Sequence, residues 1–152
     1  GGHAAAAGLT IKQENIKPFS DFINNLANQS LGQSDLAPTL MIDCEIPLEI
    51  IDLNFIHQLN VLHPFGEGNP VPVFCTKNLQ IKSPARIMGK ETLKIWVSDG
   101  KLSISAVGFG MAEYANIATT GAMVDLAYEV MIDDWNKSPT PQLKLRDIRK
   151  SE

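Results

Sequence analysis

The sequence has few of the residues that most often build metal sites and disulfide frameworks. It contains two cysteines and three histidines in 152 residues. Cys44 and Cys75 lie far apart and form no CxxC pair, which argues against disulfides and zinc knuckles and favours a reducing, cytoplasmic environment. His3, His57 and His63 lie in three different local contexts, so we expect no metal site in this chain.

Long apolar runs and nucleophile motifs are also missing. A bilayer helix needs about 20 apolar residues, and the alanine run at residues 4–7 is far shorter, so we expect no membrane partner. The sequence contains no GxSxG and no P-loop, and Ser103 and Ser105 alternate with apolar residues as ordinary strand serines do. We find no complete catalytic set and expect no catalytic residue here.

Positive charge is scarce in the first half of the chain. Residues 1–72 carry two basic and eight acidic side chains, a net charge of −6, whereas residues 73–152 carry eleven basic and nine acidic ones, a net charge of +2. The two sums give the overall −4. Only the second half is suited to a polyanion.

The chain opens with a glycine-rich segment, GGHAAAAG. Two glycines let the backbone approach an anion closely, with free amides to donate to it. His3 can donate to the same anion, so we predict that Gly1, Gly2 and His3 bind a phosphate group. The alternative is that His3 only caps a helix formed by the alanine run. Such a motif normally follows a strand, so we interpret the chain as a fragment cut inside a ligand site.

Two helices and two short strands are predicted before residue 70. Apolar residues recur with helical spacing after a capping asparagine: Phe19, Phe22, Ile23, Leu26 and Ala27. A second helix is capped by Asp52 or Asn54 and ends near His63, because the residue before a proline is pushed out of the helical region. Short strands are expected at residues 9–11 and 39–46.

In the second half of the chain, apolar residues recur at every second position. The segment LHPFGEGNPVPVF combines prolines and glycines with apolar residues, which predicts a rigid, packed connector between two units. Five strands then follow around residues 79–81, 93–97, 102–106, 124–132 and 143–145, with a hairpin at Asp99-Gly100 and a helix-like insertion at 110–121. This order predicts an antiparallel oligonucleotide-binding (OB) barrel over residues 71–152.

Trp96 and Lys94 form the first candidate binding surface. If Leu93, Ile95 and Val97 point into the barrel, both alternate side chains point outward. An aromatic ring beside a basic group is typical of proteins that stack single-stranded bases. The alternative is that Trp96 is covered by a neighbouring domain.

Six further cations are candidate phosphate contacts. Lys144 and Arg146 share the outward face of the last strand, and Lys82 and Arg86 approach it from the first strand. Lys90 and Lys137 lie in the two loops that flank an OB groove. The alternative is a solvated basic surface without a ligand.

Three motifs occur here in one order: GGHAAAAGLTI, LHPFGEGNPVPVF, and ISAVGFG within the barrel. In this respect the whole chain resembles the C-terminal portion of RecJ-type single-strand-specific DNA exonucleases, members of the DHH phosphoesterase superfamily. The resemblance implies an α+β fold, in which residues 1–70 are the C-terminal part of an α/β DHH-associated substrate-binding domain with its connector. Residues 71–152 would be a five-stranded OB domain that binds single-stranded DNA.

The same resemblance implies what the parent protein does. The parent would be a metal-dependent 5′-to-3′ single-stranded DNA exonuclease in DNA repair and recombination. Its Mn or Mg ions would be bound by a DHH domain that this sequence does not contain, while Gly1, Gly2 and His3 match the family's substrate-holding glycine element. We therefore expect the fragment to bind single strands without cleaving them.

Other partners and functions remain open from the sequence. The missing catalytic domain of the same chain is one expected partner, and a second copy, joined through an exposed sheet edge, is another. An alternative function is an OB module that docks proteins without DNA contact. A DHH-type oligoribonuclease or cyclic-dinucleotide phosphodiesterase is a third possibility. The predicted barrel argues against it, because such relatives usually lack one.

Overall fold

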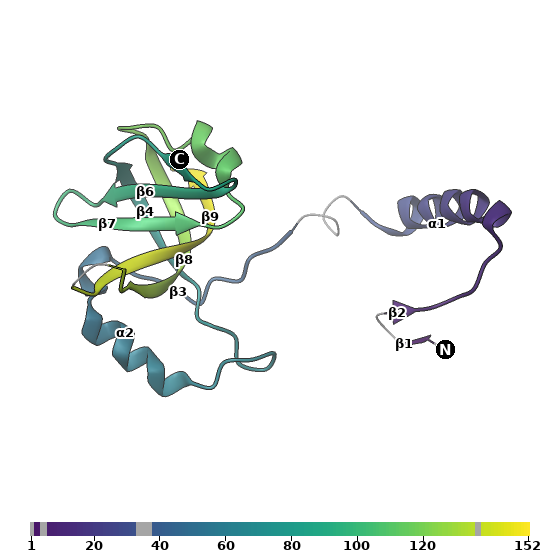
Figure 1. Cartoon of the computed structure of the whole chain (residues 1–152), viewed down its shortest axis with the longest axis horizontal. Helices are drawn as coiled ribbons and strands as arrows, with labels where there is room; N and C mark the ends of the chain where they lie inside the picture. Colours follow the sequence, from purple (N-terminus) through teal and green to yellow (C-terminus); the bar gives the residue numbers. More distant parts are fainter. Residues whose placement is uncertain (1, 4–5, 33–37, 136–137) are drawn as a thin grey trace. The chain divides into compact units, whose positions relative to one another are not determined.

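The chain folds into two compact units, Gly1–Leu40 and Met41–Glu152. The computed structural model describes residues 2–3, 6–32, 38–135 and 138–152 (Figure 1). The sequence had predicted a division near residue 70. The structure divides earlier because residues 41–73 pair with the barrel: Ile46 N donates to Cys75 O, and Thr76 Oγ1 donates to Ile46 O. No described helix is long and apolar enough to cross a membrane.

The first unit consists of a small hairpin and a helix. Its elements are β1 (Gly2–His3), β2 (Ala6–Ala7), the 3-10 turn η1 (Gln13–Asn15) and α1 (Ile16–Ser30). The helix is confirmed, but Ala6–Ala7 pairs antiparallel with β1 instead of continuing a helix, and residues 9–11 are not a strand. Within the described part of this unit, the apolar face of α1 is exposed, including Phe22 and Leu26.

The second unit is a closed barrel preceded by short helices. Before the barrel come β3 (Cys44–Glu45), η3 (Leu48–Ile50), α2 (Leu53–Leu59) and η4 (Asn60–Leu62). The barrel elements are β4 (Phe74–Ile81), β5 (Arg86–Met88), β6 (Thr92–Ser98), β7 (Ser103–Gly108), η5 (Ala112–Asn116), β8 (Met123–Asp133) and β9 (Thr140–Lys150). The strand order is β3-β4-β8-β9-β7-β6-β5, and β4 also pairs with β6, which closes the barrel.

The predicted order of elements along the chain, with a helical insertion before the last two strands, agrees with the structure, but the sheet is mixed. Seven strands take part, and two pairings are parallel: β3 with β4 and β7 with β9. The prediction of five strands that are all antiparallel was therefore wrong. The strand predicted at 39–46 is reduced to two residues, and the long first strand is divided into β4 and β5.

Alternating apolar residues fill the barrel as predicted. The side chains that are completely removed from solvent include Leu79, Leu93, Ile95, Val97, Val124, Leu126, Tyr128 and Leu143. Asp52, one of the two residues predicted as the cap, caps α2 by accepting a hydrogen bond from Phe55 N at 2.7 Å. The connector is ordered by Asn69, whose side-chain amide donates to Leu62 O and Pro64 O.

Two polar groups fasten strands to one another. Thr76 Oγ1 donates to Ile46 O at 2.6 Å, so its oxygen accepts from the Tyr128 hydroxyl, also at 2.6 Å; burial raises the pKa of Tyr128 to about 12. Asp125 accepts hydrogen bonds from Asn78 N and the Arg149 guanidinium. Burial alone would raise the pKa of Asp125, but these bonds and one from Ser151 outweigh it and lower the pKa. Asp125 thereby stabilises the bulge in β4, where Asn78 has φ of 57°.

Candidate nucleic-acid interface

The outer face of β5, β6, β7, β9 and β8 carries the candidate site. Because register partners lie on the same face of a sheet, two rows of side chains run across it. One row contains Arg86, Lys94, Val107, Lys144 and Glu129. The next row contains Trp96, Ser105, Gln142 and Met131. The predicted outward placement of Lys94, Trp96 and Lys144 is therefore confirmed.

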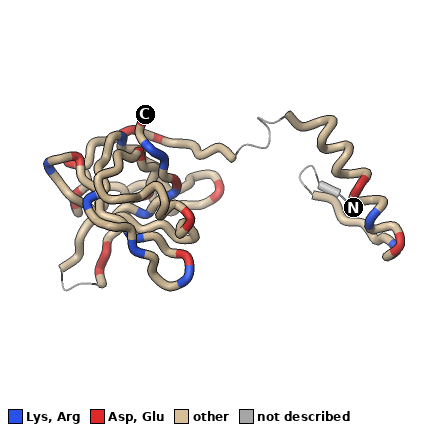
Figure 2. The backbone as a smooth tube through the Cα atoms, turned by 90° about the horizontal axis from the view of Figure 1, so that it is seen from above, with Lys and Arg blue, Asp and Glu red and all other residues tan. Residues whose placement is uncertain are grey.

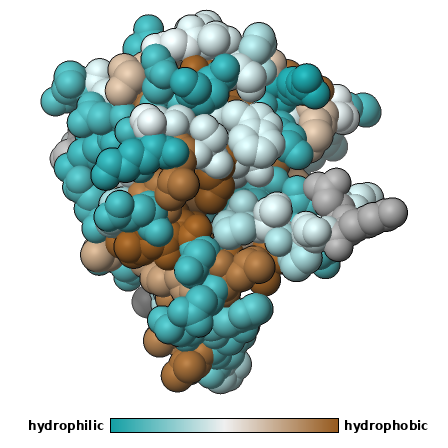
Figure 3. Space-filling view, turned by 90° about the vertical axis from the view of Figure 1, so that its left-hand side faces the viewer, coloured by the Kyte–Doolittle hydropathy of each residue, from teal (hydrophilic) through white to brown (hydrophobic). Residues whose placement is uncertain are grey.

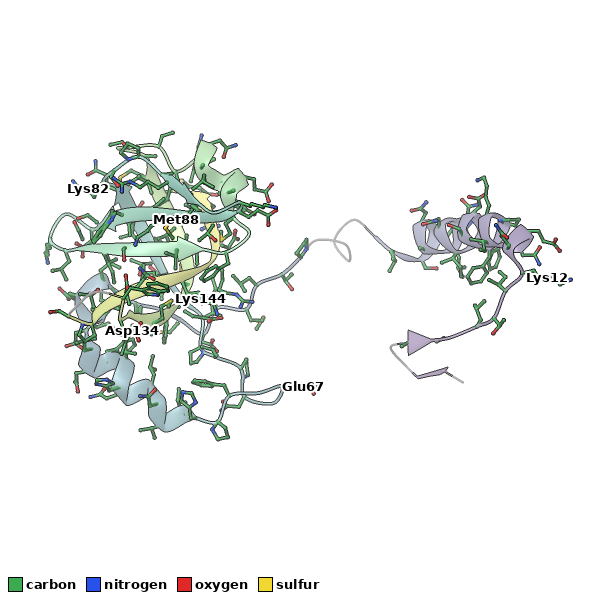
Figure 4. The ribbon with its side chains drawn as sticks, viewed as in Figure 1. Lys12, Glu67, Lys82, Met88, Asp134 and Lys144 are labelled. Atoms are coloured by element: carbon green, nitrogen blue, oxygen red, sulfur yellow. The ribbon has the colours of Figure 1, made fainter. Side chains whose placement is uncertain are left out.

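A groove of about 570 Å³ lies over the middle of both rows, at Lys94 and Val107 of the first and at Met131 and Gln142 of the second, and Arg86 and Lys144 lie outside its lining. Its lining includes Met88, Lys94, Val107, Phe109, Met131 and Trp135. Figure 4 labels Met88, the last residue of β5, Asp134, the first residue after β8, and Lys144 on β9. Met88 and Asp134 border the groove at the two connections, between β4 and β6 and between β8 and β9, that flank the ligand face of OB folds.

Two exposed aromatic rings border this groove. Trp135 is 96 % exposed, and Phe109 is also exposed. Phe109 lies between two glycines: a Cβ on Gly108 would lie 2.6 Å from Met111 Sδ, and Gly110 has φ of +71°, a backbone conformation that favours glycine. The chain turns at this point, out of β7, so Phe109 stays at the surface instead of entering the core.

Asp133, at the end of β8, binds the residues on either side of it in the sheet and in the following turn. One carboxylate oxygen accepts a hydrogen bond from Trp135 N at 3.2 Å, and the other accepts from Gln142 Nε2 at 3.3 Å. Asp133 and Asp134 both border the groove, and Lys94 is the basic residue among the described residues that line it. Because acidic groups repel phosphates, the groove itself suits an uncharged ring better than an anion.

Lys144 and Arg146 are less free than the sequence suggested. Glu129, whose side chain is 10 % exposed, binds Lys144 Nζ through one oxygen and Arg146 Nη1 through the other, both at 2.9 Å. The two cations remain 40 % and 46 % exposed. They share a face as predicted, but the carboxylate compensates part of their charge.

Trp96 lines a second, smaller hollow of about 280 Å³. It is 47 % exposed, and its neighbours in the hollow include Leu48, Ile51, Leu102 and Pro141, with no charged residue in the described lining. Figure 3, drawn from the side on which the β6–β7 turn lies in Figure 1, shows apolar side chains gathered between polar ones. Ser105 lines the hollow and Gln142 lines the groove, and Gln142 Nε2 donates a hydrogen bond to Ser105 Oγ at 2.9 Å. The hollow and the groove therefore adjoin each other.

The remaining predicted cations are dispersed. Arg86 is exposed on β5 opposite Lys94, and Lys90 is exposed in the turn before β6. Lys82 follows β4 and donates to Gln80 Oε1, while Lys137 lies outside the described residues. Figure 2 shows basic and acidic positions interspersed over the barrel.

The predicted phosphate site at the start of the chain belongs to the first unit. Gly2 and His3 form β1, and Gly1 lies outside the described residues. Among the described residues, no three His, Cys, Asp or Glu side chains are grouped to hold a metal ion. The structure therefore provides no donor set in these residues for Mn or Mg.

The comparisons with known proteins agree with this architecture. A family model described as the RecJ OB domain matches residues 42–147. The chain belongs to the RecJ OB-domain family. The resemblance read from the sequence is thereby confirmed, and the matched range begins where the second compact unit begins.

Whole-chain similarities point to the same family. The chain is 29 % identical over 153 residues to the single-stranded-DNA-specific exonuclease RecJ of Bacillus subtilis (strain 168), covering 100 % of the chain and 20 % of that protein. It is 25 % identical to RecJ of Haemophilus influenzae, covering 94 % of the chain and 25 % of that protein. The chain thus spans a fifth to a quarter of the length of these relatives.

Solved RecJ structures share the fold. RecJ of Thermus thermophilus, solved in complex with Mn2+, superposes with a TM-score of 0.71 at 21 % identity, covering 100 % of the chain and 22 % of that protein. Its complex with Mg2+ gives the same TM-score at 20 % identity.

Sequence reasoning missed Trp135, Phe109 and Glu129. Phe109 lies within the motif ISAVGFG. The glycines on both sides of it could have indicated a turn that keeps this residue at the surface. Trp135 stood in a polar turn next to two aspartates, where a large apolar residue is unusual. Glu129 gave no signal, because its pairing depends on the register of β8 with β9.

Proposed function

We propose that this chain is the nucleic-acid-binding part of a single-stranded DNA exonuclease and that its groove holds bases of the unpaired strand. The observation that carries the proposal is the exposure of Trp135 and Phe109 around a groove with Lys94 in its lining. Aromatic stacking accepts every base, so it binds single strands without reading their sequence. A duplex, whose bases are already stacked and paired, offers these rings no free face.

Charge decides how the strand lies on this face. Asp133 and Asp134 border the groove, so the phosphates lie outside it, along the row of Arg86, Lys94 and Lys144. Contacts from these cations release counterions and make the affinity dependent on salt. In this proposal Lys82, Lys90 and Arg146 add further phosphate contacts, and the contact predicted for Lys137 lies outside the described residues.

The parent protein would hydrolyse phosphodiester bonds from the 5′ end in DNA repair and recombination. We assign its Mn or Mg ions to a DHH domain outside this chain, and Gly1, Gly2 and His3 to a substrate phosphate opposite those ions. The described residues contain no acidic cluster for two-metal chemistry, so the chain alone binds without cleaving. Shortened products from the purified chain with Mn2+ and an oligonucleotide would refute this assignment.

The first unit would contact the rest of the parent. Its helix α1 exposes Phe22 and Leu26 on an apolar face, and such a face is stable when it is covered. The sequence predicted that a second copy associates through an exposed sheet edge; we propose that in the isolated chain the apolar face of α1 also takes part, and we expect concentration-dependent association in sedimentation equilibrium. A monomer at all concentrations would contradict this.

Binding is tested by fluorescence anisotropy of a labelled oligo(dT) titrated with the chain at several salt concentrations. We expect affinity that falls linearly with the logarithm of salt, and weaker binding of a duplex of equal length. Lys94→Gln is expected to weaken binding and to reduce the salt slope. The matched control is Lys150→Gln, which changes the net charge equally at the last residue of β9. Equal effects of the two substitutions would refute the proposed location.

Protein docking is the second candidate, and the hollow beside Trp96 favours it. Its lining is mostly apolar and uncharged, which suits an apolar peptide side chain. If the chain binds no oligonucleotide even at low salt, the docking function replaces the DNA function.

A further inference from the structure

Glu129 is placed where it controls the charge of the proposed DNA face. It lies on β8 directly opposite Lys144 of β9. The register shifts between the pairs Ala127–Asp147 and Tyr128–Leu145, so Arg146 is an extra residue of β9 and is the second partner of Glu129. Each carboxylate oxygen holds one cation at 2.9 Å, and the Glu129 side chain is nearly buried beneath them.

The geometry allows Lys144 and Arg146 to bind Glu129 and a DNA phosphate at the same time. An ammonium group has three donors and a guanidinium five, and each uses one hydrogen bond on Glu129. Lys144 and Arg146 remain about half exposed, so their other donors can reach a phosphate without breaking the contacts to Glu129. A phosphate therefore meets three fixed charges with a sum of +1 instead of two cations with a sum of +2.

We infer that Glu129 is an affinity-limiting residue, which weakens the hold of Lys144 and Arg146 on the phosphates of a bound single strand. This inference rests on the proposed function. An exonuclease must advance its substrate after each cleavage, so contacts that break readily help the strand to move. Glu129 also orients the two cations, and the inference requires that its charge outweighs this orienting effect.

The test is the affinity of the Glu129→Gln chain for labelled oligo(dT) at low salt. Gln keeps the shape and one acceptor oxygen but removes the negative charge. At about 6 Å from a phosphate in a largely aqueous dielectric, removing that charge is expected to tighten binding about threefold to tenfold. The salt dependence is expected to become steeper, because the cations then release more counterions.

Two further substitutions separate charge at this position from other effects. Glu113→Gln changes the net charge equally at an exposed position on η5 and is expected to leave the affinity almost unchanged. Glu129→Asp keeps the charge and is expected to bind as the wild type does. If Glu129→Gln fails to fold, as judged by thermal unfolding, Glu129→Met makes the same charge change with an adaptable apolar side chain.

Each outcome is decisive. Tighter binding by Glu129→Gln than by Glu113→Gln supports the inference. Weaker binding by Glu129→Gln would show that Glu129 mainly orients the cations, and equal binding by the two variants would show that its position is irrelevant; either result overturns the inference while leaving DNA binding intact. If neither wild type nor Glu129→Gln binds at low salt, the proposed function fails, and the inference with it.

Discussion

Replacing Trp135 by alanine is the sharpest perturbation of the proposed groove. Its side chain is 96 % exposed, so removing it takes almost no packing from the barrel. Its backbone N–H, which donates to Asp133, is kept in the variant. We therefore expect the free energy of unfolding to change by less than about 0.5 kcal/mol.

The expected effect on binding is much larger. Stacking a base on an aromatic ring contributes about 1–3 kcal/mol, so Trp135→Ala is expected to weaken oligo(dT) binding about 5-fold to 150-fold. Trp135→Phe keeps a ring for stacking and is expected to retain most of the affinity. Phe109→Ala is expected to act in the same direction.

The chain contains only two tryptophans, Trp96 and Trp135, which makes the assay direct. Intrinsic fluorescence is followed during titration with oligo(dT), and Trp135→Phe leaves Trp96 as the single reporter. We expect most of the quenching to disappear in that variant, although binding by anisotropy persists. An unchanged affinity in Trp135→Ala would refute the stacking argument.

Three stability predictions follow from the fold. Asp125→Asn is expected to lower the free energy of unfolding, measured in urea, by about 1–3 kcal/mol. Because folding lowers the pKa of Asp125, its contribution to stability is complete above the ordinary pKa and is lost as pH falls through the folded-state value. A stability difference between wild type and variant that does not change with pH would contradict this prediction. Thr76→Val is expected to destabilise more than Tyr128→Phe, because it leaves the buried Tyr128 hydroxyl without an acceptor; equal losses would refute this order. Gly108→Ala is expected to lower the melting temperature, because the new Cβ displaces Met111; an unchanged melting temperature would show that this site tolerates a side chain.

The sequence predicted the features that depend on local chemistry. A period of two identified Leu93, Ile95 and Val97 as core residues, and these are fully buried. The apolar helical pattern predicted a cap at Asp52 or Asn54, and the observed bond from Phe55 N shows that Asp52 is the cap. Motif order alone indicated the family.

Features that depend on pairing between distant strands could not be predicted. The parallel contact of β7 with β9 joins residues 37 positions apart, and no local periodicity encodes it. The division after Leu40 was missed for a similar reason: residues 41–73 belong with the barrel through hydrogen bonds such as that from Thr76 to Ile46 O. The composition of the segment LHPFGEGNPVPVF predicted a connector between two units. Composition does not show whether the residues before a connector pack against the unit that follows it.

The central claim is that single-stranded DNA lies across β6, β7 and β9 between the two flanking loops. Amide chemical-shift mapping of the isotope-labelled chain during titration with oligo(dT) tests it most directly. We expect the largest shifts at Lys94, Val107, Phe109, Trp135 and Gln142, with little change in α2. Shifts confined to the hollow of Leu48 and Leu102, or no shifts at low salt, would contradict the account.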